Sequence, residues 1–176
     1  MEEKSEKIAD IVDNLRRVFQ VVHGQSKKAE RETGLTSSQL WAIKVMSEAG
    51  SIRVSDLARR MYLHPATTVG ILDRLEKKGL VSRTRSLEDR RVVNVALTQE
   101  GRGIVEKSPQ VAQGLLVAGL EKLSSANLKK IDEGLGQMVK ILGAQEIPPQ
   151  LILSPEVNEP EAQVKSRSRR KKESNS

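Results

Sequence analysis

Residues 55–80, which read SDLARRMYLHPATTVGILDRLEKKGL, decide the fold of this chain. The first part predicts a short helix over residues 56–61, with Ser55 as its N-cap. A brief turn follows, and Pro65 lies where a proline is favoured in the first turn of a second helix. This second helix is expected to end ahead of Gly79, because glycine is a typical C-cap residue. The stretch therefore predicts two short helices separated by a tight turn.

The pattern changes from helical to extended after this stretch. Residues 81–86 and 92–97 are rich in β-forming side chains and flank the charged segment 87–91, which predicts a hairpin. Before the stretch, residues 36–38 (Thr-Ser-Ser) offer an N-cap for a further helix, and residues 52–54 form a short extended piece. The order of helix, short strand, helix, turn, helix and hairpin is that of a winged helix-turn-helix.

Amphipathic helical regions flank this middle part on both sides. Residues 5–30 carry apolar side chains at helical spacing. Thr98 caps a further helix, and residues 101–123 are helical in pattern but loosened by Pro109 and four glycines. Ser124 or Ser125 caps a last helix, whose apolar positions repeat like a coiled-coil seam. The positions of this seam are Leu128, Ile131, Leu135, Met138 and Leu142. The small middle part cannot bury these faces alone, so we expect a twofold dimer rather than the alternative, a monomeric helical bundle.

Composition excludes several classes of protein and favours a polyanion as partner. The chain has 176 residues, 30 Lys and Arg against 23 Asp and Glu, no cysteine, two histidines, and one Trp, one Tyr and one Phe. These counts argue against disulfides, zinc ribbons, iron–sulfur clusters, thiol redox sensing and a base-stacking single-strand binder. Residues 51–102 hold eleven basic side chains against six acidic ones, which is typical of a nucleic-acid binder.

The rest of the chain carries no signal for a membrane, a metal or catalysis. No apolar run is long enough to span a bilayer and the N-terminus is acidic, so we expect a cytoplasmic protein without membrane contact. No set of residues typical of a catalytic or metal site occurs, so we expect no enzyme activity and no cofactor. Four prolines in residues 145–163 and the basic run KSRSRRKK at 165–172 predict that residues 145–176 are a disordered tail.

Three stretches within residues 35–102 read LTSSQLWAI, SDLARRMYLHPATTVGILDRLEKKGLV and DRRVVNVALTQEG. Their order and spacing resemble the MarR (multiple antibiotic resistance regulator) family. The most distinctive motif is DRRxxxxxLTxEG, which is intact at residues 89–101. The resemblance extends over roughly residues 5–142. It implies a mainly α fold with a small β-hairpin wing, in which a winged helix-turn-helix is joined to a helical dimerisation domain.

This reading divides the chain into four parts. Residues 1–34 are the N-terminal dimerisation helix, and residues 35–100 are the winged helix-turn-helix that binds DNA. Residues 101–144 are the C-terminal dimerisation helices, and residues 145–176 are the tail rich first in proline and glutamate and then in basic residues.

The resemblance implies roles in DNA binding for residues of the helices and the wing. The second helix of the helix-turn-helix would enter the major groove, and Asp89 would brace Arg91 for the minor groove. Ser37 and Ser38 match a helix N-terminus that holds a phosphate. Gly70 departs from many relatives, which carry a long polar side chain there. The candidate DNA-binding residues are Ser37, Ser38, Ser55, Arg59, His64, Ala66, Thr67, Thr68, Gly70, Arg74, Arg85, Asp89, Arg90 and Arg91.

The resemblance also implies an effector pocket between the dimerisation helices and the DNA-binding lobe. The candidate effector contacts are Arg16, Phe19, His23 and Trp41, with core packing as the alternative for Trp41. We therefore predict a homodimeric repressor that a small aromatic or anionic effector releases from a near-palindromic operator in double-stranded DNA. The alternatives are a DNA-binding regulator without a ligand and an architectural DNA-binding protein.

Overall fold

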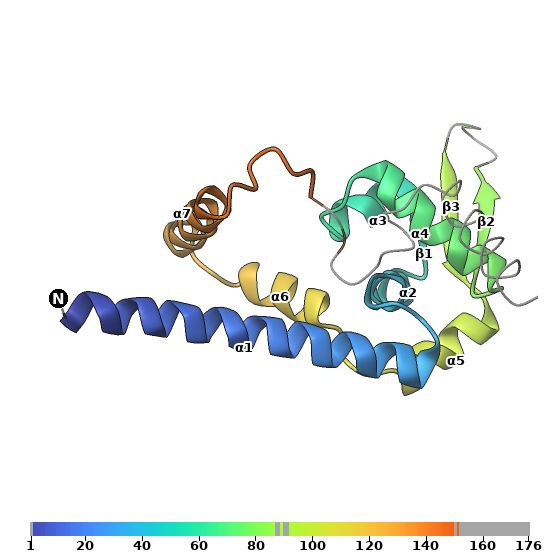
Figure 1. The fold of residues 1–176 in the computed structure, drawn as a ribbon. Coiled ribbons are helices and arrows are strands. Elements are labelled where there is room, and N and C mark those ends of the chain that lie inside the picture. Colours follow the sequence, from blue (N-terminus) through green and yellow to red (C-terminus); the bar gives the residue numbers. More distant parts are fainter. Residues whose placement is uncertain (1, 87–88, 90–91, 150, 152–176) are drawn as a thin grey trace, which may run out of the picture.

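The computed structural model of this chain describes residues 2–86, 89, 92–149 and 151. Its elements, in chain order, are α1 (Glu2–Thr33), α2 (Ser37–Ala49), β1 (Ser51–Arg53), α3 (Val54–Arg60), α4 (Pro65–Lys77), β2 (Val81–Arg85), β3 (Val93–Leu97), α5 (Gln99–Lys107), α6 (Ala112–Leu120) and α7 (Ser125–Ile141). α1 runs beneath α6 towards α2, and the strands lie at the opposite end of the molecule from α7 (Figure 1). The mainly helical chain with a small antiparallel sheet confirms the predicted fold class.

Side-chain caps explain where several helices begin and end. The Thr36 hydroxyl accepts a hydrogen bond from the backbone N–H of Gln39, whose side chain accepts one from the Thr36 N–H, which makes a capping box at the start of α2. Thr98 and Ser124 cap α5 and α7 by accepting from backbone N–H groups three residues further on. Gly79 ends α4 in the left-handed conformation, with a φ of 72°. These boundaries confirm the helix signals of the sequence.

The three described strands form an antiparallel sheet in the order β1–β3–β2. β3 is the central strand, and its Val95 lies opposite Ile52 of β1 and Arg83 of β2. Val95 and Leu97 are buried, whereas Arg85 at the end of β2 is exposed. The hairpin is therefore as predicted, and the short extended piece before α3 becomes the third strand.

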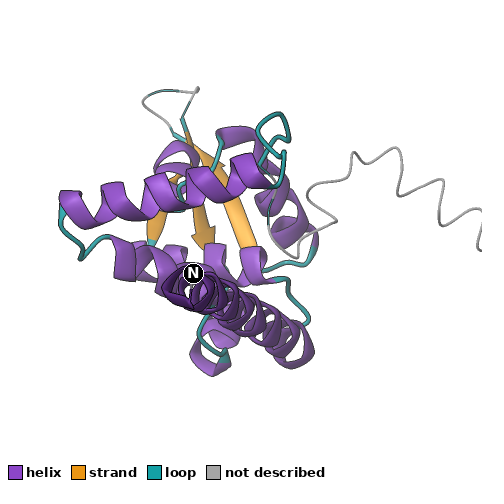
Figure 2. Cartoon of the chain, turned by 60° about the vertical axis from the view of Figure 1, so that its left-hand side comes forward, coloured by secondary structure: helices purple, strands orange, loops and turns teal. Residues whose placement is uncertain are grey.

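The hydrophobic core lies around α2. Leu40, Ile43 and Met46 of this helix are fully buried and share one cluster with Leu57 of α3 and Leu72 of α4. In Figure 2 the sheet lies among the helices, with the N-terminal end of α1 towards the viewer. This core fixes α3 and α4 against α2 and the sheet, and it leaves the outer face of α4 exposed.

Two predicted helices differ in the structure. β1 runs directly into α3, so Arg53 occupies the N-cap position and Ser55 lies inside the helix without capping it. Residues 101–123 form α5 and α6 rather than one helix. Ser108 has an extended backbone, with φ −85° and ψ 147°, because it precedes Pro109, and a residue before proline disfavours the helical region.

The outer helices leave much of their apolar surface exposed. α7 contains no buried residue, and α1 buries only Ser26 and Ala29. Leu135 and Leu142 of the predicted seam are 56% and 75% exposed. The seam is therefore present on α7, and it faces solvent in the single chain.

The predicted tail, residues 145–176, lies largely outside the described residues. Its described part, 145–149 and 151, contains no helix or strand. Leu151 is partly buried against the core cluster, a contact that the sequence does not predict.

Candidate nucleic-acid interface

The N-terminal half of α4 presents small side chains to solvent. His64 is its N-cap, and Nδ1 of His64 accepts a hydrogen bond from the backbone N–H of Ala66 at 3.3 Å. Ala66 and Val69 are exposed, and Thr67 and Gly70 are half-buried. A helix start without long side chains can come close to base edges in a major groove.

Thr68 faces the core and not the groove. Its side chain is fully buried, and its hydroxyl donates to the carbonyl oxygen of His64 at 3.3 Å. Successive residues of a helix are about 100° apart, so Thr67 and Thr68 cannot share one face. The prediction that Thr68 contacts DNA is therefore wrong.

Ser37 and Ser38 at the start of α2 are also buried. They are 3% and 0% exposed, and Oγ of Ser38 lies 3.2 Å from Oγ1 of Thr36. A DNA phosphate cannot reach a helix start that is packed inside the lobe, so the prediction that these serines hold a phosphate is wrong. Ser55, by contrast, is exposed on α3.

A groove of about 590 Å³ lies between α4 and the wing. Arg53 lines it from the end of β1, Ser55 from the start of α3 and Val69 from α4. Arg83 and Arg85 line it from β2. Arg53 and Arg85 beside this groove suit a phosphate backbone.

Arg83 is a residue of this site that sequence reasoning missed. Its Nη1 lies 2.6 Å from Oδ1 of Asp73 and 3.6 Å from Oε2 of Glu76, and its Nη2 donates to the carbonyl oxygen of Val69 at 3.3 Å. The three acceptors all belong to α4, so Arg83 ties the wing strand β2 to that helix. Asp73 and Glu76 lie on one helix face, but only the tertiary fold brings a strand arginine to them.

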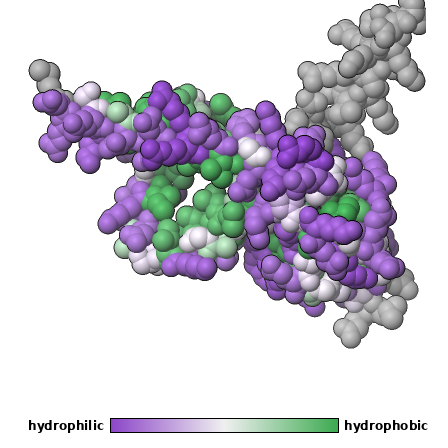
Figure 3. Space-filling view, turned by 90° about the horizontal axis from the view of Figure 1, so that it is seen from below, coloured by the Kyte–Doolittle hydropathy of each residue, from purple (hydrophilic) through white to green (hydrophobic). Residues whose placement is uncertain are grey.

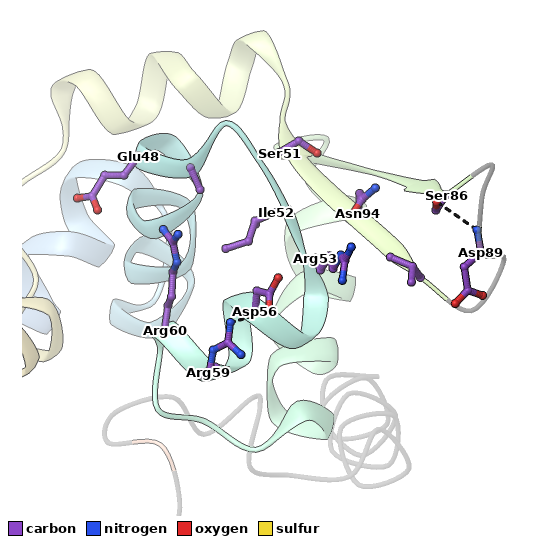
Figure 4. Close-up of a pocket in the computed structure, with 12 residues that line it drawn as sticks. Glu48, Ser51, Ile52, Arg53, Asp56, Arg59, Arg60, Ser86, Asp89 and Asn94 are labelled. Carbon is purple, nitrogen blue, oxygen red and sulfur yellow. Dashed lines mark hydrogen bonds and ion pairs between the residues drawn. The ribbon is translucent and has the colours of Figure 1, made fainter.

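A second cleft, of about 840 Å³, lies between α3 and the wing (Figure 4). Arg59 of α3 and Arg53 of β1 line one side, and Ser86 and Asp89 line the other. Nη2 of Arg59 pairs with Oδ1 of Asp56 at 2.9 Å while the Arg59 side chain stays 80% exposed. Arg53 lines both hollows, so the groove and the cleft adjoin.

The remaining predicted DNA contacts lie on α4 and at the wing tip. Arg74 is half-buried, and its Nη1 donates to the carbonyl oxygen of Gly70 at 3.4 Å. Asp89 is exposed, and its N–H donates to Oγ of Ser86 at 3.4 Å. Arg90 and Arg91, the predicted wing-tip arginines, lie outside the described residues.

A cavity of about 560 Å³ lies between α2 and α6. Trp41, which is 7% exposed, belongs to the core and also lines this cavity. A Cβ on Gly114 of α6 would lie 3.4 Å from the indole ring, so α6 passes close to Trp41 at this residue. Lys44, Tyr62 and Glu121 are among the polar residues that line the same cavity.

The three other predicted effector contacts do not line this cavity. Arg16, Phe19 and His23 are exposed on α1, and Arg16 pairs with Asp13 at 2.8 Å. Different α1 residues, including Val18 and Val22, line an apolar groove of about 430 Å³ with α6. The spacing of three and four residues puts the predicted contacts on one stripe of α1, which is rotated away from the stripe that meets α6. The single chain therefore does not bring these residues together with Trp41, and their role as effector contacts in a dimer stays a prediction.

The described residues carry neither a metal site nor a membrane span. Within that part of the chain, no three His, Cys, Asp or Glu side chains gather into a group that could hold a metal ion. In the same residues, no helix is both long enough and apolar enough to cross a membrane.

A helix-turn-helix beside a three-stranded wing, with arginines between them, defines a DNA-binding protein of the winged-helix class. The model of the MarR family matches residues 35–93. The HTH-type transcriptional repressor MdtR of Bacillus subtilis (strain 168) is 34% identical over 101 residues, which are 57% of this chain and 65% of that relative. The match thus spans slightly less than two thirds of the length of MdtR.

Two more relatives match over larger shares of this chain and of their own length. The organic hydroperoxide resistance transcriptional regulator of Bacillus subtilis (strain 168) is 30% identical over 118 residues, 67% of this chain and 79% of the relative. The crystal structure of a MepR like protein complexed with pseudoligands matches with a TM-score of 0.51 and 26% identity, over 80% of this chain and 97% of that chain. This chain belongs to the MarR family of winged helix-turn-helix transcriptional regulators.

Proposed function

We propose that this chain is a homodimeric repressor that binds a near-palindromic operator and acts in the cytoplasm, where that DNA lies. α4 enters the major groove, and the wing contacts the flanking DNA. The observation that carries this proposal is the groove between α4 and β2, which the exposed Val69 of α4 and the exposed Arg85 of the wing both line. Arg53, Arg59 and Arg85 supply phosphate contacts beside it.

We infer that a second copy of the chain covers the apolar faces of α1, α6 and α7. Leu115 and Leu116 of α6 are 50% and 62% exposed, and Leu135 of α7 is 56% exposed. Figure 3 shows apolar side chains gathered around a hollow between the helical arms. Large exposed apolar patches mark protein interfaces. In a twofold dimer, the patch on one copy covers the same patch on the other. Residues 1–34 and 101–144 then serve dimerisation, and residues 35–100 bind DNA.

Leu135→Glu is expected to dissociate the dimer and leave the single chain folded. Leu135 is already 56% exposed in the single chain, so a carboxylate there is solvated, whereas in a dimer it would be buried without a partner. We expect the dimer dissociation constant to rise at least about 100-fold, measured by sedimentation equilibrium, with loss of operator binding. Gln137→Glu, on the opposite side of α7, is the control and should remain dimeric. A Leu135→Glu dimer as tight as the wild type would contradict an interface on this face.

We further propose that the cavity between α2 and α6 binds a small aromatic anion that releases the DNA. Trp41 offers a flat apolar surface, and Lys44 and Arg60 offer positive charge. The pseudoligands in the crystal structure of the MepR like relative support a ligand site in this fold. Because the cavity lies between the DNA-binding lobe and α6, a ligand there can change the spacing of the two α4 helices in a dimer.

Operator binding by the full chain tests this function. The purified protein is titrated with its own upstream DNA in moderate salt, with and without a panel of aromatic carboxylates and their CoA thioesters. We expect preference over random DNA of equal length, and one carboxylate that both lowers the affinity and changes the fluorescence of Trp41, the single tryptophan. Specific binding that no compound relieves would favour a regulator without a ligand, and binding without sequence preference would favour an architectural protein.

A further inference from the structure

Tyr62 lies in the turn between α3 and α4, where its backbone conformation is unfavourable for a tyrosine. Its φ is 52°, and among the residues that the structure describes it is the only non-glycine residue with a positive φ. Glycine adopts this left-handed region freely, whereas a Cβ makes it unfavourable. Such strain persists where the surrounding structure holds the residue in place, which makes the tyrosine side chain a candidate for a specific role.

The Tyr62 side chain reaches from the helix-turn-helix to the end of α6. Its hydroxyl donates a hydrogen bond to Oε1 of Glu121 at 2.9 Å, across 59 residues of sequence. Glu121 is the C-cap residue of α6. Backbone hydrogen bonds fix the turn itself, from Tyr62 to Arg59 at 3.1 Å and from Leu63 to Ala58 at 3.0 Å. The Tyr62–Glu121 bond therefore joins two ordered elements from different parts of the fold.

The charge of Glu121 strengthens this bond. The hydrogen bond to the Glu121 carboxylate, together with the negative charge of that group, raises the pKa of the Tyr62 phenol above its ordinary value of 10.0. The phenol is thus neutral near pH 7 and keeps the proton that it donates. Lys44, Glu48 and Arg60 are further charged residues that line the cavity shared by the pair.

We propose that Tyr62 and Glu121 are positioning residues, whose hydrogen bond holds the helix-turn-helix in the DNA-binding orientation relative to α6. Tyr62 and Glu121 contact neither a base nor a phosphate in the proposed complex. The pair acts by removing the freedom of the DNA-binding lobe to swing against the dimerisation helices, which lowers the entropy lost on operator binding. The inference rests on the operator binding proposed above. It adds that the Tyr62–Glu121 hydrogen bond, at the edge of the cavity beside Trp41, connects α6 to the turn that precedes α4.

The first experiment asks whether the bond forms in solution. Tyr62 is the only tyrosine of the chain, so an ultraviolet titration of the phenolate in the full-length protein reports on this group alone. We expect a pKa above 10 in the wild type and a lower pKa in Glu121→Ala, because that variant loses the acceptor and its charge. Identical titration curves for the two proteins would overturn the proposal, whatever the protein does with DNA.

The second experiment measures operator affinity in a double-mutant cycle. Tyr62→Phe and Glu121→Ala should each weaken binding to the upstream DNA fragment about fivefold, and the double variant should be no weaker than either single one. Glu121→Gln keeps an oxygen acceptor and should restore most of the affinity. Binding to random DNA and the dimer constant should not change, because neither depends on the orientation of α4. Unchanged or tighter operator binding, or additive effects in the double variant, would overturn the proposal.

Tyr62→Asn separates a positioning role from a merely structural one. Asparagine tolerates a positive φ better than tyrosine does, but its short side chain cannot reach Glu121. We expect this variant to keep or raise the thermal midpoint while losing operator affinity as Tyr62→Phe does. Parallel losses of both properties would overturn the proposal. A wild-type chain that showed no preference for its upstream DNA would refute the proposed function instead, and the phenol titration would still show whether the bond exists.

Discussion

Gly101→Ala is expected to lower the unfolding free energy by about 3 kcal/mol and the thermal midpoint by about 10 °C. Gly101 is buried in the first turn of α5, where a Cβ would overlap the carbonyl oxygen of Leu80 and lie 3.2 Å from its carbonyl carbon. The same Cβ would come within 3.4 Å of Cδ2 of Leu97. Backbone cannot move aside as a flexible side chain can, so α5 must shift away from the base of the wing.

Neighbouring contacts make that shift costly. The carbonyl of Leu80 also accepts a hydrogen bond from the N–H of Thr98 at 3.1 Å, and the Thr98 hydroxyl donates to the carbonyl of Gly79 at 2.8 Å. Moving α5 therefore disturbs the connection between β3, α5 and the end of α4. This arrangement supplies a physical reason for the glycine that closes the motif at residues 89–101.

Gly103→Ala is the matched control for this experiment. Gly103 lies two residues further along α5, and a Cβ there would meet no atom within 4 Å. Alanine favours a helix over glycine by about 1 kcal/mol, so this variant should be as stable as the wild type or more stable. Thermal unfolding of the wild type and both variants at one protein concentration, followed by circular dichroism, measures the two changes in midpoint. Equal midpoints for the two variants would show that Leu80 and Gly101 do not pack as described.

Local signals are enough to predict most of the fold. Pro65, Gly79 and Thr98 act on backbone within a few residues of themselves, so the helix and strand boundaries near them are read directly from the sequence. Pro109 loosens the helical pattern of residues 101–123, but the sequence does not show that α5 ends before it, because a proline can also kink a continuous helix. A serine before a helical pattern has the chemistry of a cap, which predicts Ser55 in that role, whereas the direct passage from β1 into α3 puts Arg53 in the N-cap position.

The candidate site is less predictable because its geometry depends on contacts between distant residues. Neighbouring threonines look alike in sequence, yet the packing of α4 buries Thr68 and leaves Thr67 partly exposed. In the sequence Arg83 is one basic residue among many, because only the tertiary fold brings its acceptors on α4 to it. Tyr62 carried no signal at all, because neither its positive φ nor its bond to Glu121 has a local signature.

Arg83→Met is expected to weaken operator binding about tenfold while costing only about 1 kcal/mol of stability. Methionine keeps an apolar stem but loses the bonds to Asp73, Glu76 and the Val69 carbonyl. The side chains of Asp73 and Glu76 are 45% and 43% exposed, so water can solvate them when the arginine is gone. β2 remains paired with β3, and the wing therefore stays folded. The variant loses the fixed position of the wing relative to α4. Operator binding requires this position, because the wing and α4 contact the DNA at the same time.

Arg85→Met is the matched control, because Arg85 lies two residues further along β2 and is exposed. If Arg85 contacts a phosphate, its loss lowers the slope of log affinity against log salt concentration by about one. Arg83→Met should leave that slope unchanged, because Asp73 and Glu76 already neutralise the Arg83 charge within the chain. Fluorescence anisotropy titrations of the operator at several salt concentrations measure both slopes. An equal fall in slope for the two variants would mean that Arg83 contacts DNA itself, and a normal affinity for Arg83→Met would mean that the wing needs no brace from α4.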